Sequence, residues 1–354
     1  MFLLMFLNRQ PKKLIFKNFK LFTFIVILFI LYYFSTINQP LPTNNLSKTW
    51  YSENNISREE FIEKNIKPIL GQPPSLQKEI SPLIKINDLN FFYINPLNEK
   101  VPVIILNYPK QKRISNNLPS PGLVVAIHET NTVGGEEPCG QVGREEMFYG
   151  KMIADRGYIV VCPTLTFTGI RQPTNQWDTA EFYKKYPNWS AIGKDITEIS
   201  WLIDSLSLSG FNVNHVALVG HSQGAIYSLF SAALDTRIHT VIANAGFVDF
   251  RKDPNPERWS RHSWYKALPY IPKNFTEAEL VAAIAPRNAL ICNYLQDEIL
   301  VATSPNDEIQ DMMRKFSSIN WAFFNGKHGW PTEVQQFALS WLSKKFPVNK
   351  ISNN

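Results

Sequence analysis

The pentapeptide Gly220-His221-Ser222-Gln223-Gly224 constrains this chain more than any other stretch. A short apolar run, residues 216–219, precedes it, and a stretch without helix breakers, residues 225–234, follows it. A strand, a tight G-x-S-x-G turn and a helix in this order predict a nucleophile elbow, in which a strained turn exposes the serine hydroxyl above a sheet. Only a residue without a Cβ tolerates the close backbone approach on either side of the serine. Ser222 is therefore the candidate nucleophile.

Apolar runs of strand length alternate with helical stretches from about residue 88 onward. Strands are expected at residues 90–94, 101–107, 122–127, 158–162, 215–220, 241–245, 289–294 and 321–325, and helices at 144–156, 190–208, 225–234, 306–317 and 332–346. The first two strands are expected to form a hairpin. Most of the others are apolar along their whole length, which is typical of parallel strands covered on both faces. The sequence predicts an α/β fold in residues 81–348, with a mostly parallel central sheet, helices on both faces and an insertion at about 250–286, where five prolines interrupt the alternation.

The N-terminal part differs in composition from the rest. Residues 1–20 contain five basic and no acidic residues, so that the net charge of +6 leaves only +1 for the remainder of the chain. Residues 21–37 are nearly all apolar and just long enough to span a bilayer. The basic flank predicts a cytoplasmic N-terminal segment, a transmembrane signal anchor and a catalytic domain outside the cytoplasm. A cleaved signal peptide, and hence secretion, is the alternative, although a small-x-small cleavage pattern is missing.

Several other features narrow the possible partners. Residues 38–80 have the composition of a linker, with a short helix expected over residues 58–65. The nearly neutral remainder of the chain does not support a nucleic-acid partner. Three cysteines (Cys139, Cys162 and Cys292) allow at most one disulfide, and the last two are expected as buried small hydrophobic side chains because they lie in or beside apolar strands. No metal-ligand spacing is present, so neither a metal nor a cofactor is expected.

A serine hydroxyl needs an adjacent base to act as a nucleophile, and an acid to orient that base. After a nucleophile elbow the chain order is serine, acid, histidine. Of the three histidines that follow Ser222, only His328 lies in a loop directly after the last expected strand, whereas His239 begins a strand and His262 falls in the insertion. Catalytic side chains belong in such loops at strand ends, and His328 is the expected base.

The acid should follow the strand before that loop. Asp297 does so, with its neighbour Glu298 and the earlier Asp249 as alternatives. Two backbone N–H groups are needed for the developing oxyanion. Gln223, the residue after the nucleophile, is expected to supply one, and the loop after residues 122–127 the other, from Thr130 or, as second choice, Glu129.

Several stretches of this sequence resemble α/β-hydrolases of the dienelactone hydrolase and acetyl xylan esterase type. The matching stretches cover about residues 120–346 and read VVAIHETN, GGEEPCG, ADRGYIVVCPTLTFTG, LVGHSQG, AAIAPRNALI and HGWP. The resemblance implies the acid at Asp297, the base at His328 and an oxyanion donor at Thr130. Dienelactone hydrolases use cysteine as the nucleophile, so the serine here implies the esterase branch.

The expected function is that of a serine hydrolase acting on a small-molecule carboxylic ester, with an acetyl or other small acyl group. A peptidase or lipase of the same fold and a non-catalytic binding protein are the alternatives. Seven residues are candidates for substrate contacts, with a role in packing as the alternative for each: Arg144, Arg171, Trp177, Tyr183, Trp259, Trp264 and Tyr265.

Overall fold

The computed structural model describes residues 56–76, 78–109, 122–173, 178–246, 276–299 and 307–348. All of them belong to the unit Lys48–Asn354, the second of the two into which the chain divides. The expected anchor at residues 21–37 and residues 250–275 of the expected insertion lie outside the described residues. Within the described part of the chain, no helix combines the length and the apolar character that crossing a membrane requires.

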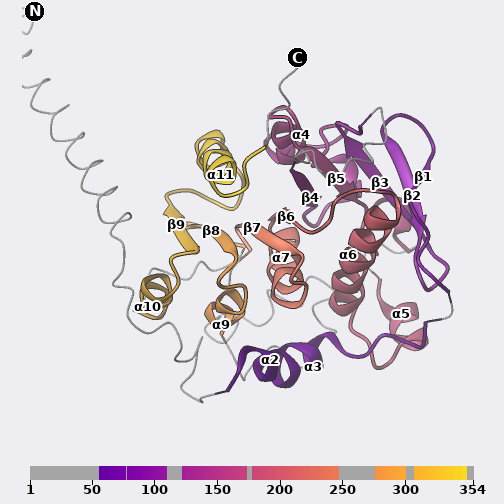
Figure 1. Ribbon diagram of the computed structural model, residues 1–354, viewed down its shortest axis with the longest axis horizontal. Coiled ribbons are helices and arrows are strands. Elements are labelled where there is room, and N and C mark those ends of the chain that lie inside the picture. The colour runs from indigo at the N-terminus through magenta and orange to yellow at the C-terminus, as the bar shows by residue number, and fades with distance from the viewer. Residues whose placement is uncertain are drawn as a thin grey trace, which may run out of the picture. The chain divides into compact units, whose positions relative to one another are not determined.

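One sheet organises the described residues, with the strand order β1-β2-β3-β5-β4-β6-β7-β8-β9 (Figure 1). The strands are β1 (Ile84–Lys85), β2 (Asn90–Ile94), β3 (Lys100–Leu106), β4 (Leu123–Ile127), β5 (Ile159–Pro163), β6 (Val216–His221), β7 (Ile238–Asn244), β8 (Asn288–Tyr294) and β9 (Ile319–Phe324). The six strands from β5 to β9 in this order pair in parallel, and β1, β2 and β3 form an antiparallel edge. The expected mostly parallel α/β sheet and the expected hairpin are therefore confirmed.

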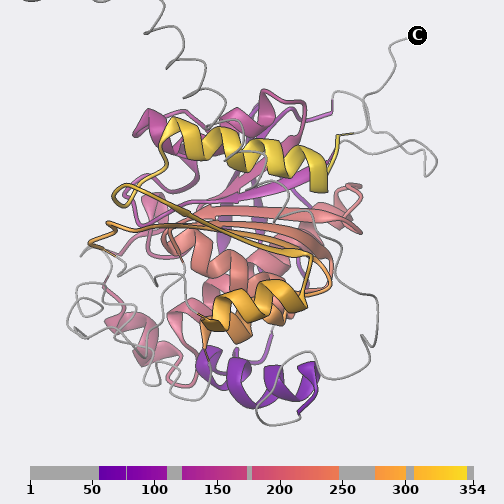
Figure 2. The same cartoon turned by 90° about the vertical axis from the view of Figure 1, so that its left-hand side faces the viewer.

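Helices cover both faces of this sheet (Figure 2). One face packs against α4 (Tyr149–Ala154) and α11 (Thr332–Lys345). The other packs against α6 (Ala191–Leu208), α7 (Gln223–Leu234), α9 (Glu277–Ala282) and α10 (Asp307–Lys315). Every position of β4, β5 and β6 is buried, which explains why these strands show no alternation of polar and apolar residues.

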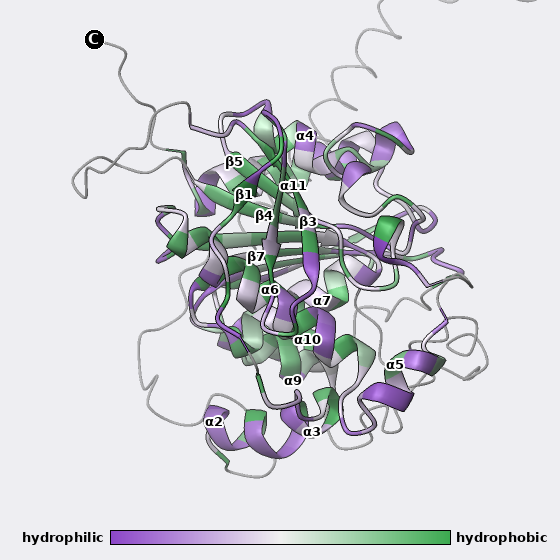
Figure 3. Ribbon diagram, turned by 90° about the vertical axis from the view of Figure 1, so that its right-hand side faces the viewer, coloured by the Kyte–Doolittle hydropathy of each residue, from purple (hydrophilic) through white to green (hydrophobic). Residues whose placement is uncertain are grey.

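Shorter helices lie around this core. They are α2 (Arg58–Phe61), a π-helix (Ile62–Ile66), α3 (Lys67–Leu70), α5 (Ala180–Lys185) and the 3₁₀ turns Gly134–Glu136, Glu145–Met147 and Gly169–Arg171. Figure 3 shows hydrophobic residues along the strands and mostly hydrophilic ones on α5. The α2–α3 segment falls within the range expected as a linker, yet Phe61, Ile66 and Leu70 are buried. Arg58 also donates hydrogen bonds to the carbonyls of Ala233 and Ala283, so this segment packs on the domain.

The single helix expected at residues 144–156 is instead a 3₁₀ turn followed by α4. Arg144 has an extended backbone, and its N–H donates to the Glu137 carboxylate over 3.1 Å, which delays the start of the helix. Phe148, with ψ of 34°, then separates the two helical pieces. Both causes are contacts or dihedrals that the helical composition of this stretch does not reveal.

Cys139 and Cys162 form a disulfide, whereas Cys292 is a buried thiol. Cys162 is buried as expected, but it is bonded to Cys139, so the prediction that it serves simply as a small hydrophobic side chain was wrong. The loop after β4 returns across the neighbouring strand β5, which brings the two sulfurs together although 23 residues separate them. The bond ties this loop to the sheet.

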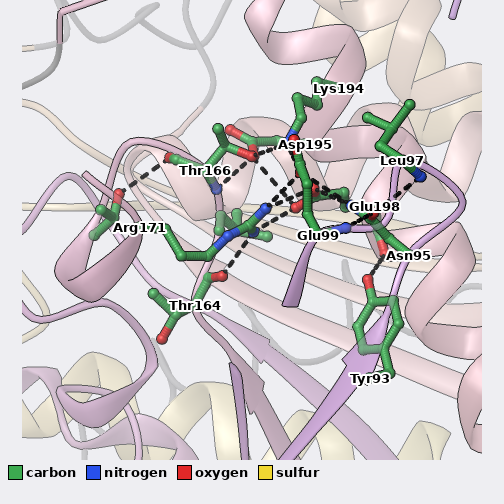
Figure 4. Close-up of polar contacts among 12 residues, drawn as sticks. Tyr93, Asn95, Leu97, Glu99, Thr164, Thr166, Arg171, Lys194, Asp195 and Glu198 are labelled. Carbon is green, nitrogen blue, oxygen red and sulfur yellow. Dashed lines mark hydrogen bonds and ion pairs between the residues drawn. The ribbon is translucent and has the colours of Figure 1, made fainter. Parts of the chain in front are cut away.

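A buried cluster of charged residues joins α6 to the β2–β3 hairpin and to the loop after β5 (Figure 4). Arg171 donates to both carboxylate oxygens of Glu198, over 2.6 and 2.7 Å, and Lys194 lies 2.7 Å from Glu198 and from Glu99. Opposite charges in direct contact offset much of the cost of removing each from water. Arg171 is thus part of the fold, so that of its two expected roles the structure supports packing and not a substrate contact.

Asp195 is the third carboxylate of this cluster. Within the described ranges, the three carboxylates of Asp195, Glu198 and Glu99 face two cations, Arg171 and Lys194. Burial, with repulsion from Glu198, raises the pKa of Asp195 from 3.8 to about 7. The folded state therefore holds this proton more tightly than the unfolded state does. The corresponding stability is present at low pH and is lost as the pH rises from about 4 through about 7.

We expect Asp195→Asn to weaken this pH dependence, because the amide oxygen can still accept the Thr166 N–H, 2.9 Å from the Asp195 carboxylate, without carrying a charge. Between pH 5 and pH 8, the melting temperature of the wild type should fall more than that of the variant. At pH 8 the variant should be the more stable protein, by about 1–3 kcal/mol. The exposed Asp155→Asn serves as the control, and parallel curves for the wild type and Asp195→Asn would contradict the assignment.

Candidate active site

The G-x-S-x-G turn joins β6 to α7 and holds Ser222 in a strained conformation. Its φ of 51° and ψ of −118° lie in a region that side-chain-bearing residues rarely adopt. A Cβ on Gly220 would collide with the carbonyl oxygen of Gly224, and one on Gly224 with that of Ile127. Both flanking glycines are therefore required by the packing of the α7 N-terminus against β6 and β4. The resulting turn is the elbow expected from the sequence.

Asp297 and His328 meet above the ends of two neighbouring strands. Asp297 follows β8 and His328 follows β9, and 2.7 Å separates Asp297 Oδ2 from His328 Nδ1. The second carboxylate oxygen accepts the Ile299 N–H over 2.9 Å. Because Asp297 occupies Nδ1, the ring presents Nε2 for proton transfer.

The alternative acid Glu298 lies on the surface, with 81% of its side chain exposed and Lys327 4.0 Å distant. Asp249, the other alternative, lies outside the described residues.

His328 lies beside the elbow. Its ring centroid is 4.8 Å from that of His221, the residue before Ser222. Among the described residues, no hydrogen bond joins the Ser222 hydroxyl to His328. Bonds of this kind commonly tighten only in the substrate complex. The structure thus brings the expected acid and base into contact and places the base against His221, the residue before the expected nucleophile.

The two expected oxyanion donors also lie together. Thr130 donates from Oγ1 to Gln223 Oε1 over 2.7 Å, and Gln223 donates from Nε2 to the Tyr227 hydroxyl, also over 2.7 Å. The Gln223 side chain therefore holds the loop after β4 at the start of α7. The first N–H groups of a helix have no partner within it and carry a partial positive charge. An oxyanion formed above Ser222 would meet such groups.

Glu129, the second choice for an oxyanion residue, has its side chain engaged elsewhere. Its carboxylate contacts the Arg144 guanidinium and lies 3.2 Å from His221 Nε2. Burial opposes ionisation of this group, but the contacts with His221 and Arg144 outweigh it and lower the pKa of Glu129. Arg144 is half exposed and also lies near Glu137 and Glu146. Glu129 and Arg144 together form an ion pair at the edge of the elbow.

Two side chains beside this site were not anticipated from the sequence. His221 is fully buried, and Asn244, at the end of β7, contacts it. Asn244 has a weak signal in the sequence, since it is the polar residue at the end of the apolar run VIAN.

Tyr183, a candidate for a substrate contact, accepts the Ala191 N–H over 2.8 Å and packs on Phe182, so it stabilises the fold. Trp177, Trp259, Trp264 and Tyr265 lie outside the described residues.

Comparisons with solved structures find this architecture in known proteins. A glucuronoyl esterase from Solibacter usitatus matches with a TM-score of 0.52 at 14% identity, over 86% of this chain and 99% of its own. A promiscuous esterase of carbohydrate esterase family 15 from a marine bacterial metagenome matches with a TM-score of 0.57 at 14% identity, over 86% and 98%. A “putative acetyl xylan esterase” from Bacteroides fragilis matches with 0.56 at 14% identity, over 88% and 93%. The chain has the α/β-hydrolase fold. The resemblance noted in the sequence is confirmed at this level.

Comparison of sequences finds less similarity to known proteins than comparison of structures does. No family model matches the chain. The curated “Putative hydrolase YtaP” from Bacillus subtilis (strain 168) is 28% identical over 96 residues, which cover 27% of this chain. That match spans about a third of the relative, 32% of its length. The α/β-hydrolase fold therefore rests on structural similarity, and the chemistry must be argued from the site itself.

The geometry favours Asp297 over Glu298 as the acid, which a serine-directed probe can test. We expect Asp297→Asn to lower the rate constant of Ser222 labelling by a fluorophosphonate by about 10³–10⁴-fold, because the histidine loses its orienting carboxylate. Glu298→Gln, the matched control, should react like the wild type, since its side chain is 81% exposed. Equal losses in both variants, or no loss in Asp297→Asn, would be the contrary result.

Proposed function

We propose that this protein is a serine hydrolase that cleaves carboxylic esters. The observation that carries the proposal is the 2.7 Å contact between Asp297 and His328 beside the strained turn of Ser222. These groups come from the ends of β6, β8 and β9, where catalytic residues of open α/β sheets collect. The similar solved structures include a glucuronoyl esterase and a proposed acetyl xylan esterase, which supports ester hydrolysis over other reactions of this fold.

In the proposed mechanism, the Ser222 oxygen attacks the ester carbonyl carbon while His328 Nε2 takes the hydroxyl proton. Asp297 holds the imidazole and stabilises its positive charge. The N–H groups of Gln223 and Thr130 stabilise the tetrahedral oxyanion. Its collapse breaks the carbon–oxygen bond, and His328 gives the proton to the leaving alcohol. Water then attacks the acyl-enzyme on Ser222, with His328 again as base, and releases the carboxylic acid. Every proton in this cycle passes through His328.

We further propose a small acyl group, such as acetyl, as the part of the substrate bound nearest to Ser222. The early loop is held close to the elbow by the Thr130–Gln223 bond of 2.7 Å, and Glu129 and Arg144 fill its edge as a contacting ion pair. Space for a long acyl chain on this side would require breaking these contacts. The “putative acetyl xylan esterase” of similar structure is named for an acetyl ester, which supports this proposal.

Replacement of the nucleophile tests this function. Ser222→Ala should lower kcat/KM for p-nitrophenyl acetate by about 10⁴–10⁶-fold, because the covalent route is lost. Ser231→Ala in α7 is the matched control, since its buried hydroxyl makes no hydrogen bond within the described part of the chain, and it should keep wild-type activity. Activity should also decrease from acetyl to long acyl esters. Hydrolysis that survives Ser222→Ala would refute the mechanism.

We also propose that the domain works outside the cytoplasm, attached by an anchor at residues 21–37. The apolar composition of that segment and the lysines before it support an anchor. The Cys139–Cys162 disulfide supports an oxidising compartment, because cytosolic thiols are kept reduced. The alternative for the same segment is cleavage and release of the domain.

Carbonate extraction of membranes distinguishes the two forms. The full-length protein should stay in the membrane pellet, whereas a variant lacking residues 1–37 should appear in the soluble fraction. Peptide mapping of the unreduced protein should show Cys139 bonded to Cys162. Release of the wild type, with an N-terminus beyond residue 37, would replace the anchor with a cleaved signal. Reduced Cys139 and Cys162 would contradict the oxidising compartment.

A further inference from the structure

Asn244 lies at the meeting point of the strands that carry the proposed triad. It is the last residue of β7 and is fully buried. Across the sheet it is opposite His221 of β6 on one side and Cys292 of β8 on the other. β7 itself contributes no member of the proposed triad. Its end nevertheless separates the strand of the nucleophile from the strands of the acid and the base.

Four hydrogen bonds connect this residue to the parts of the site. Its backbone carbonyl accepts the N–H of Ser222 over 2.9 Å. Its side-chain Nδ2 donates to the carbonyl of Gly329, the residue after His328, over 2.9 Å, and contacts His221 Nδ1 over 2.8 Å. Its Oδ1 accepts the hydroxyl of Tyr294 over 2.9 Å. One side chain therefore bonds to the elbow, to the base loop and to the strand of the acid.

The donor and acceptor roles in this group are determined by chemistry. The Gly329 carbonyl can only accept, so the amide nitrogen of Asn244 must face it. The same nitrogen then donates to His221 Nδ1, which leaves the ring proton on Nε2, 3.2 Å from Glu129. Burial lowers the pKa of His221 and raises that of Tyr294, which keeps the imidazole neutral and the phenol a donor. Each polar atom of the Asn244 amide is thus used.

We propose that Asn244 is a positioning residue for the proposed ester hydrolysis, on which this inference rests. The bond between Asp297 and His328 joins two loops to each other, but by itself leaves that pair free to shift relative to Ser222. The bond from Asn244 to Gly329 fixes the base loop to β7, and the bond from Ser222 to Asn244 fixes the elbow to the same residue. Misplacement of a catalytic group by about 1 Å can cost about 10²-fold in rate.

The hydrogen bond from Tyr294 fixes the orientation of the Asn244 amide. Tyr294 ends β8, three residues before Asp297, and its hydroxyl holds the Asn244 amide in one orientation. Rotation of the amide by half a turn would put its oxygen against the Gly329 carbonyl oxygen, where both would be acceptors. Tyr294 is therefore expected to act through Asn244, and its loss should have the same kind of effect at a smaller size.

The experiment compares Asn244→Ala, Tyr294→Phe and the control Thr240→Val. Thr240 lies on the same strand, is buried and has a hydroxyl without a hydrogen bond among the described residues, so its replacement removes a polar group without breaking a bond. Active sites are counted by complete labelling with a fluorophosphonate, and kcat and KM for p-nitrophenyl acetate are expressed per labelled site. We expect kcat per site to fall about 10²-fold in Asn244→Ala and about fivefold in Tyr294→Phe, with unchanged KM. Thr240→Val should match the wild type.

A purely structural role would give a different pattern. The melting temperature and the fraction of labelled sites would fall, while kcat per labelled site would stay at the wild-type value, and this result would overturn the proposal. If Asn244→Ala does not fold, Tyr294→Phe decides alone, and a wild-type kcat in that variant would also overturn it. A wild type that is neither labelled nor active would overturn the ester hydrolase proposal and this inference together.

Discussion

The strained backbone of Ser222 is the constraint on which the rest of the site depends. A φ of 51° in a residue with a side chain persists only where the surrounding contacts hold it, and here they come from both sides of the turn. The Ser222 N–H is bonded to the end of β7, and the glycines at positions 220 and 224 let α7 start directly against β6 and β4. The packing of the turn against the sheet therefore maintains the backbone conformation of Ser222.

Ion pairs hold the two loops beside the elbow. The buried charged cluster around Arg171 and Glu198 fixes the loop after β5, and the half-exposed Arg144 pairs with the buried carboxylate of Glu129 in the loop after β4. Buried ion pairs add little net stability compared with apolar packing, but a broken one is costly. The buried cluster therefore strongly penalises other positions of the loop after β5.

Features that depend on local patterns could be predicted from the sequence. Continuous apolar runs predicted the parallel strands, and the serine between two glycines predicted the elbow. His328 and Asp297 were assigned from their places after consecutive strands, and the structure brings the two into contact. The roles of Thr130 and Gln223 stay predictions. In each case the information lay within a few residues of the feature.

Contacts between distant segments could not be predicted in this way. The pairing of Cys139 with Cys162 depends on a loop crossing to the next strand, whereas the apolar strand around Cys162 indicated only that it would be buried. Arg171 lies in a polar loop, and the sequence left open whether it contacts substrate or packs, because its carboxylate partner, Glu198, is on α6, 27 residues away. The positioning role proposed for Asn244 likewise depends on its contacts with His221, Tyr294 and Gly329, which lie outside β7.

The disulfide has a practical consequence for anyone who handles this protein. It closes a ring of backbone that contains α4 and begins in the same loop as Glu129 and Thr130. In the chain-entropy view, a ring of this size restricts the unfolded chain by about 3 kcal/mol. Material produced in a reducing cytosol and material exported through an oxidising compartment would then be two different preparations with one sequence. The oxidation state of Cys139 and Cys162 should therefore be determined, like the protein concentration, before the rates of two samples are compared.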